Sequence, residues 1–236
     1  MYRTIRAEKV IETAQRLSER VRERFPSAGL SRVADEILAV ARETEERARL
    51  IGRPNVPLRV GVFALIALGV GFIVMVARNV RVSETVWDAA NFIQASESLL
   101  GDFVFLGAAI AFLVTLETRV KRGRALAAIN ELRALAHIID MHQLTKDPEM
   151  VLAQHAPTAA SPERRLTPFE LNRYLDYCSE MLAIVSKIAG LYVQGFPDSQ
   201  ALAAVDEIES LTTGLSQKIW QKLVILDRYT KDGATA

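Results

Sequence analysis

The stretch VGVFALIALGVGFIVMVA, residues 60–77, contains no charged or strongly polar side chain. As an α-helix it would be roughly 27 Å long at 1.5 Å per residue, close to the ~30 Å hydrocarbon thickness of a bilayer. A surface helix of a soluble protein would carry a polar face, and this stretch has none. The stretch therefore predicts a transmembrane helix over about residues 58–78.

A second apolar segment, at residues 99–118, is weaker. Its uninterrupted apolar part, FVFLGAAIAFLVTL at residues 103–116, is short enough to be a buried helix of a soluble protein. The longer segment takes in Asp102 and Glu117 near its ends, where a charge costs much less than the ~2.5–3.5 kcal/mol of the bilayer centre. We interpret it as a second span, in which Asp102 is a candidate intramembrane acid for an ion path.

The distribution of charge favours two spans with both termini in the cytoplasm. Arginine and lysine concentrate before residue 60 and after residue 118, whereas residues 78–102 hold two arginines and four acids. Because cytoplasmic segments carry the excess of positive charge, we expect a membrane hairpin at residues 57–118 with a short outer loop at residues 79–98. The flanking basic residues could also bind anionic lipid headgroups, although topology alone explains them. These residues are Arg53, Arg59, Arg119, Lys121, Arg122 and Arg124.

Small residues recur at helical spacing in both predicted spans. They are Ala64, Ala67 and Gly71 in the first span and Gly107 and Ala111 in the second. Faces of small residues let membrane helices approach closely. We expect the two spans to pack on each other through these faces, and packing on a second protomer is the alternative.

The residues on either side of the membrane hairpin show helical periodicity. Residues 1–56 predict a cytoplasmic helical hairpin that is broken at FPSAG, residues 25–29, with Ser31 as the cap of its second helix. The second span is expected to continue as one helix to about residue 142, because no proline interrupts residues 102–147. This cytoplasmic extension, residues 119–147, carries an apolar seam. The seam comprises Ala125, Ala128, Leu132, Leu135 and Ile139.

A polar linker at residues 148–166 precedes a C-terminal helical hairpin at residues 167–230. The sequence TPFE predicts its start, with Thr167 as N-cap, Pro168 at the first helical position and Glu170 closing a capping box. The first helix carries an a/d seam over three heptads. Two helices bury only one stripe each, so we expect this hairpin to need further partners. The seam comprises Leu171, Leu175, Cys178, Leu182, Val185, Ala189 and Tyr192.

The stretch LAHIIDMHQLTKDPEM, residues 135–150, is the best candidate for a metal site. His137 and Asp140 are three residues apart and can meet on a helix, but His142 lies five residues from His137, about 140° around it. A zinc-binding helix needs two ligands at i and i+4. We therefore interpret His142 as the last position of the seam. His137, Asp140 and His142 stay weak metal candidates, which a helix break before His142 would strengthen.

Composition and motifs exclude several classes of function. Lysine and arginine total 29 against 28 acids, so there is no global nucleic-acid signature. Cys178 is the only cysteine, which excludes an internal disulfide, and its seam position indicates a buried structural thiol. The N-terminus lacks the apolar region of a cleavable signal peptide. The sequence has no phosphate-binding loop, dinucleotide fingerprint, nucleophile elbow or CxxC pair, so we expect neither a cofactor nor an enzyme.

Together these patterns predict an all-α integral membrane protein of a bacterial inner membrane, with a two-span hairpin and a cytoplasmic helical bundle. Its partners would be the lipid bilayer and either copies of itself or a cytoplasmic protein, and not nucleic acid. The leading hypothesis is a non-enzymatic scaffold or assembly protein. The alternatives are an oligomeric effector or small channel gated by the bundle, and a metal-dependent enzyme that uses the tract from His137 to His155.

Overall fold

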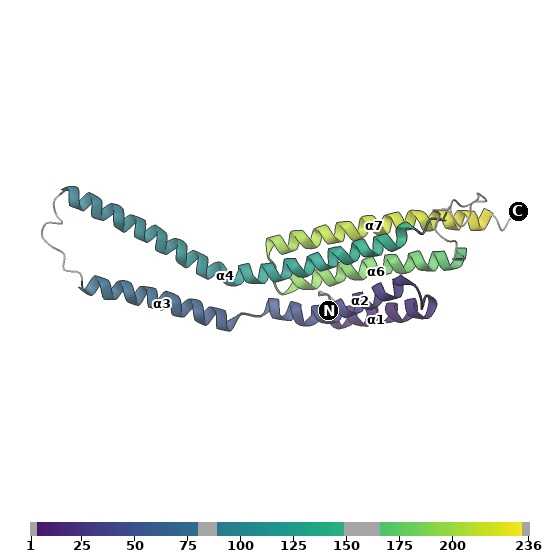
Figure 1. Cartoon of the computed structure of the whole chain (residues 1–236), viewed down its shortest axis with the longest axis horizontal. Helices are drawn as coiled ribbons and strands as arrows, with labels where there is room; N and C mark the ends of the chain where they lie inside the picture. The colour runs from purple at the N-terminus through teal and green to yellow at the C-terminus, as the bar shows by residue number, and fades with distance from the viewer. Residues whose placement is uncertain (1–3, 80–88, 149–165, 233–236) are drawn as a thin grey trace. The chain divides into compact units, whose positions relative to one another are not determined.

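The computed structural model describes residues 4–79, 89–148 and 166–232, and the regular elements in these ranges are all α-helices (Figure 1). The chain divides into two compact units, which we call the bundle (Met1–Arg53 with Arg124–Ala236) and the hairpin (Pro54–Gly123). The all-α prediction is confirmed for the described residues. In chain order the helices are α1 (Ala7–Arg24), α2 (Gly29–Gly52), α3 (Val56–Asn79), α4 (Ala89–Leu144), α6 (Pro168–Gln194) and α7 (Ser199–Asp232).

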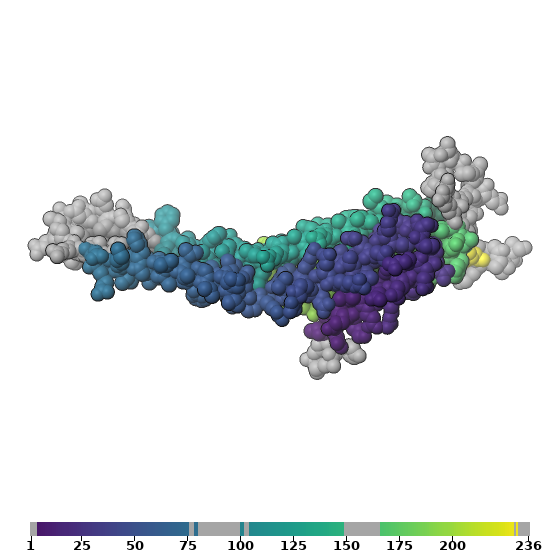
Figure 2. Space-filling model, turned by 60° about the horizontal axis from the view of Figure 1, so that its bottom comes forward, coloured from purple at the N-terminus to yellow at the C-terminus, as the bar shows by residue number. Residues whose placement is uncertain are grey.

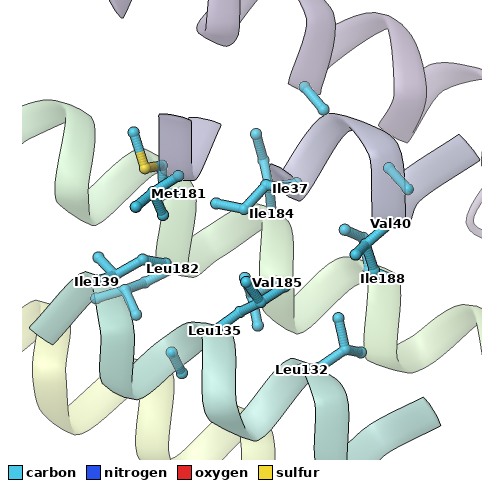
Figure 3. Close-up of a cluster of buried hydrophobic side chains, with 14 of the residues drawn as sticks. Ile37, Val40, Leu132, Leu135, Ile139, Met181, Leu182, Ile184, Val185 and Ile188 are labelled. Atoms are coloured by element: carbon cyan, nitrogen blue, oxygen red, sulfur yellow. The ribbon is translucent and has the colours of Figure 1, made fainter. Parts of the chain in front are cut away.

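Helix α6 is the central helix of the bundle and packs against α1, α2 and α7. Its predicted seam is buried throughout, and in Figure 3 Leu182 and Val185 of this seam lie beside the bundle part of α4. The α4 residues that meet them are Leu135 and Ile139, which belong to the seam predicted for that helix. Both predicted seams are therefore buried in the core, and they pack against each other.

A second buried stripe on α6 faces a different neighbour. Figure 3 shows Ile184 and Ile188 beside Ile37 and Val40 of α2. Successive residues of a helix lie 100° apart, so the residue before each seam residue faces a different neighbouring helix. Helix α6 therefore contacts several helices at once, and the α6–α7 pair is not a separate hairpin. The second stripe comprises Tyr174, Tyr177, Met181, Ile184, Ile188 and Leu191.

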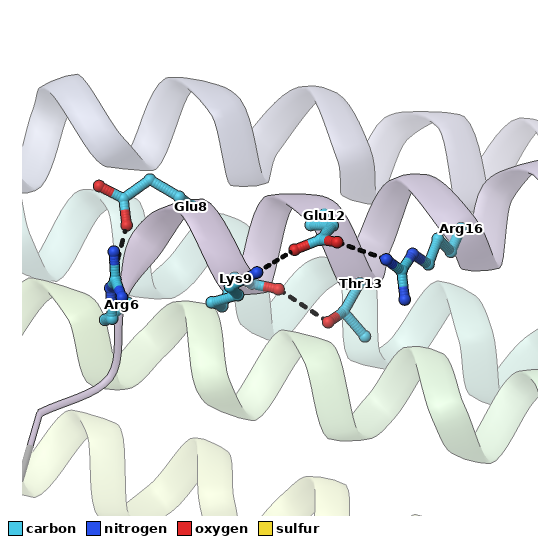
Figure 4. Close-up of polar contacts among 6 residues, drawn as sticks. All are labelled: Arg6, Glu8, Lys9, Glu12, Thr13 and Arg16. Carbon is cyan, nitrogen blue, oxygen red and sulfur yellow. Dashed lines mark hydrogen bonds and ion pairs between the residues drawn. The ribbon is translucent and has the colours of Figure 1, made fainter. Parts of the chain in front are cut away.

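Helix α2 lies between α1 and the bundle part of α4 on the face shown in Figure 2. The apolar stripe of α1, which comprises Val10, Ala14, Leu17 and Val21, is buried. The opposite face of α1 carries exposed ion pairs, in which Glu12 accepts from Lys9 at 2.6 Å and pairs with Arg16 (Figure 4). Such exposed pairs add little stability, so burial holds α1 in place.

Two helix starts differ in how well the sequence predicted them. At α6 the capping box is confirmed: the Glu170 N–H donates to Thr167 Oγ1 at 3.2 Å, and the Thr167 N–H donates to the Glu170 carboxylate at 2.8 Å. The expectation that Ser31 caps α2 is wrong. The helix begins two residues earlier, at Gly29, and the Ser31 hydroxyl instead donates to the backbone oxygen of Phe25.

The end of α2 touches the end of α6 backbone to backbone. A Cβ placed on Gly195 would lie 3.2 Å from the Cα of Gly52, and one placed on Gly52 would lie 3.4 Å from the Cα of Gly195. Because neither residue has a side chain, each leaves room for the backbone of the other. This contact holds the end of α2 against the end of α6, immediately before the chain enters the hairpin at Pro54.

In the hairpin, α3 exposes large apolar side chains around most of its circumference. Phe63 is 70 % exposed, Leu68 72 % and Phe72 66 %, and these residues point in different directions around the helix. Among the described residues, one helical stretch, Gly29–Met75, contains a window that is long and apolar enough to cross a membrane, and none of that window is buried. The charged sequence of α2 places this window in α3. The second predicted span, which lies in α4, stays a prediction.

Candidate functional site

A charged cluster joins α3 to α4 within the hairpin. The Glu117 carboxylate accepts from Arg59 Nε at 2.6 Å and from the Asn55 backbone N–H at 3.0 Å, and it pairs with Lys121 at 2.9 Å. These contacts place the beginning of α3 beside the middle of α4, near the end of its hairpin part. Arg59 and Lys121, predicted as topology or lipid-binding residues, thus form ion pairs with Glu117 of the same protein.

The small residues of the two predicted spans lie away from the face shielded within the hairpin. The half-buried stripe of α3 is Leu58, Val62 and Ile66, whereas the face of Ala64, Ala67 and Gly71 points nearly opposite at 100° per residue. In α4 the half-buried stripe is Leu106, Ile110 and Leu113, and Gly107 and Ala111 lie about a third of a turn away. Among the described residues, no atom beyond the local helix backbone and the chain neighbours lies within 4 Å of a Cβ built on Gly71 or Gly107. Packing of these small faces on other helices stays a prediction.

Three further residues of the predicted basic set are Arg53, Arg119 and Arg124. Arg119 lies over the ring of Phe112 at 5.0 Å in the hairpin. Arg53 and Arg124 are exposed, and Arg124 lines a cavity of the bundle. Asp102 belongs to α4, but its side chain lies outside the described residues, so its proposed place on an ion path stays a prediction.

The histidine tract lies on an unbroken helix. α4 continues through Met141 to Leu144, so the break that would have strengthened the metal hypothesis is absent there. His137 is exposed, whereas His142 is half-buried and its Nδ1 lies 3.3 Å from the Tyr174 hydroxyl. No group of three or more metal-binding side chains occurs among the described residues, and His155 lies outside them.

His142 packs against α2 as well as α6. A Cβ placed on Gly29 would lie 2.7 Å from His142 Cε1, so this glycine makes room for the imidazole ring. Burial lowers the pKa of His142 below its ordinary value of 6.5, and the positive charges of Lys146 and Arg32 lower it further. The ring is therefore neutral in the folded bundle at neutral pH, as a structural position requires.

The bundle should lose stability as the pH falls below the ordinary pKa of His142. Because the folded pKa is lowered, the unfolded chain binds a proton that the folded chain does not. The free energy of unfolding is therefore highest above about pH 6.5 and decreases below it, by at most about 1.4 kcal/mol per pH unit. Thermal unfolding followed against pH should show this decrease in the wild type and in His137→Gln, but not in His142→Gln. Parallel losses in all three proteins would contradict it.

The C-terminal end of α4 is held by a lysine from α7. Lys222 Nζ donates to the backbone oxygens of Gln143 at 2.8 Å and Lys146 at 3.2 Å, and burial lowers its pKa. The last carbonyls of a helix lack partners within it, and a cation there also favours the helix dipole. Lys222 was missed because nothing local to it shows which helix end it reaches.

Cys178 is an inert thiol. Its side chain is fully buried, and burial raises its pKa to about 12. A nucleophilic cysteine needs a lowered pKa and access to solvent. The structure therefore agrees with the interpretation of Cys178 as part of the core.

A cavity of about 350 Å³ opens at the end of the bundle where the chain passes to and from the hairpin. We call it the junction cavity. Its walls include Arg47 and Leu50 of α2 and Arg124, Ala127 and Glu131 of α4. Arg47 Nη1 donates to Glu131 at 2.7 Å, and Tyr192, a buried residue that also lines the cavity, shares a hydrogen bond of 3.0 Å with Thr44. None of these pairings was predicted from the sequence.

Comparisons with known proteins found no family model, no curated protein and no solved structure that matches the chain.

Proposed function

We propose that the chain is a non-enzymatic membrane scaffold, in which a two-span hairpin anchors a cytoplasmic helical bundle that binds copies of itself or a partner protein. The observation that supports anchoring most strongly is α3. Its large side chains are exposed around most of the helix, and burying apolar surface is the main favourable term in folding. A bilayer supplies the apolar surroundings that the rest of the chain does not.

A stripe on α4 supports the assembly role of the bundle. Ile138, Met141 and Leu144 follow one another at three-residue spacing and are 40 %, 67 % and 61 % exposed. Isolated apolar residues are normal on a protein surface, but neighbouring ones on one helix face are typical of protein contacts. His137 lies on the same side of the helix and would belong to that contact.

Cysteine accessibility tests the membrane anchor. The wild type offers a silent background, because its single thiol, Cys178, is buried. We expect a membrane-impermeant maleimide applied to intact cells to label Asn79→Cys, at the exposed end of α3. Gln217→Cys, exposed on α7, should be labelled only after permeabilisation. Labelling of both positions from the same side, or recovery of the protein in the soluble fraction, would contradict the two-span anchor.

Met141→Glu tests assembly separately from anchoring. It places a charge in the exposed stripe without removing core packing, so we expect dissociation of the oligomer or loss of a co-purifying protein. The control is Gln217→Glu on α7, which adds the same charge outside the stripe. The measurement is the mass of the detergent-solubilised complex together with its protein composition. A monomeric wild type whose co-purifying proteins do not change in Met141→Glu would overturn the assembly role.

A further inference from the structure

The junction cavity combines an apolar wall with an excess of positive charge. Leu50, Ile51 and Ala127 supply apolar surface, while the charged lining consists of two guanidinium groups, Arg47 and Arg124, and one carboxylate. Its volume of about 350 Å³ lies within the range of small-molecule sites, roughly 300–1,000 Å³. A ligand that fits this lining carries negative charge next to an apolar part.

The two arginines differ in how they are held. Arg47 Nη1 donates to Glu131 and Nη2 pairs with Glu43, each at 2.7 Å, and these two contacts fix the guanidinium group. Arg124 makes no ion pair with another described residue and is exposed at the rim. The cavity thus offers one fixed and one adaptable guanidinium group, a combination suited to a phosphate.

The position of the junction cavity in the chain decides between a free phosphate and a lipid. Ile51 lies three residues before the hairpin begins at Pro54, and Arg124 directly follows its last residue, Gly123. If the hairpin spans a membrane, as proposed above, these residues come at the cytoplasmic boundary of both spans. An amphiphile there can hold its phosphate at the arginines and its glycerol and upper acyl carbons against Leu50 and Ala127.

We propose that the junction cavity binds the phosphate headgroup of an acidic glycerophospholipid, and that Arg124 is its principal contact. This site rests on the proposed membrane anchor. It differs from the general attraction of basic flanks to anionic membranes, because it assigns the binding to one cavity and not to the number of positive charges.

Native mass spectrometry of the full-length protein released from phosphatidylglycerol nanodiscs tests this site. We expect the wild type to retain phosphatidylglycerol, and Arg124→Gln to retain it about fivefold less, corresponding to one basic residue near the surface. Ala127→Phe, which fills the cavity from an exposed wall position without changing charge, should have a similar effect. Arg119→Gln is the matched control, because it removes the same charge from a residue that does not line the cavity.

Each outcome decides the proposal. Equal loss in Arg119→Gln and Arg124→Gln, or unchanged retention in Ala127→Phe, would show diffuse attraction and overturn the cavity site. Millimolar inorganic phosphate should leave the retained lipid in place, since phosphate lacks the apolar part; displacement would assign the cavity to a soluble anion. Failure of the wild type to enter nanodiscs at all would instead refute the membrane anchor, so the two proposals fail separately.

Discussion

Leu68→Arg should strongly reduce the fraction of protein that resists alkaline extraction from membranes. Leu68 lies near the middle of α3 and is 72 % exposed, so the substitution removes almost no packing within the protein. At the bilayer centre, however, an arginine costs about 2.5–3.5 kcal/mol on insertion scales, and the lost leucine adds a few tenths more. A change of about 3 kcal/mol corresponds to roughly a hundredfold shift in the insertion equilibrium.

The direction of the Leu68→Arg effect shows whether α3 lies in a bilayer or on the surface of a soluble protein. On the surface of a soluble protein, replacing an exposed leucine by arginine changes stability by less than about 0.5 kcal/mol and improves solubility. The matched control is Leu144→Arg, at a leucine that is 61 % exposed in the bundle part of α4. Membrane retention should be unchanged there. Equal retention of Leu68→Arg and Leu144→Arg would show that α3 does not cross the bilayer.

The parts of the fold that follow from local spacing could be predicted from the sequence. The seams of α4 and α6 are buried as expected, because a 3.6-residue period fixes which side chains share a face. The capping box at Thr167 was equally local. The second stripe of α6, from Tyr174 to Leu191, has the same spacing but was not predicted, because a helix with one partner buries only one stripe. A central helix packs against several partners and buries two.

The contacts that assemble the helices could not be predicted, since they join residues far apart in the chain. Lys222 reaches the end of α4, and Gly52 meets Gly195 at the backbone; neither residue carries a local signal of its partner. The candidate metal site could be judged from local spacing. His137 and His142 lie about 140° apart around one helix, and in the unbroken α4 His137 is exposed.

Small residues in the predicted spans show why a motif needs the rotation of its helix. The spacing of Gly107 and Ala111 indicates a helix–helix contact, but spacing does not say which way the face points. In the hairpin, Glu117 holds Arg59 and Asn55 and turns its own face of α4, with Ile110 and Leu113, toward α3. The small face is left outside this contact. The sequence pattern does not show whether lipid or protein contacts this face.

Leu182→Ala should destabilise the bundle by about 2–5 kcal/mol, the cost measured for fully buried leucines in other proteins. Leu182 is 0 % exposed and lies beside Ile139 of α4, so its truncation opens a cavity between the central helix and the helix that continues from the hairpin. The spread in the expected cost reflects how far the neighbours can relax into that cavity. Leu202→Ala, at a leucine that is 41 % exposed on α7, should cost well under half as much.

The labelling of Cys178 gives a readout of this destabilisation that is specific to the bundle. The thiol is the only one in the chain and is fully buried on the same helix, so a maleimide reacts with it only when the bundle opens. Global circular dichroism would instead mix the bundle with the helices of the hairpin. In increasing denaturant, Cys178 of Leu182→Ala should become reactive at a clearly lower concentration than in the wild type, and that of Leu202→Ala close to it. If Leu182→Ala and the wild type become reactive together, α6 does not carry the core, and the assignment of the seam between α4 and α6 is wrong.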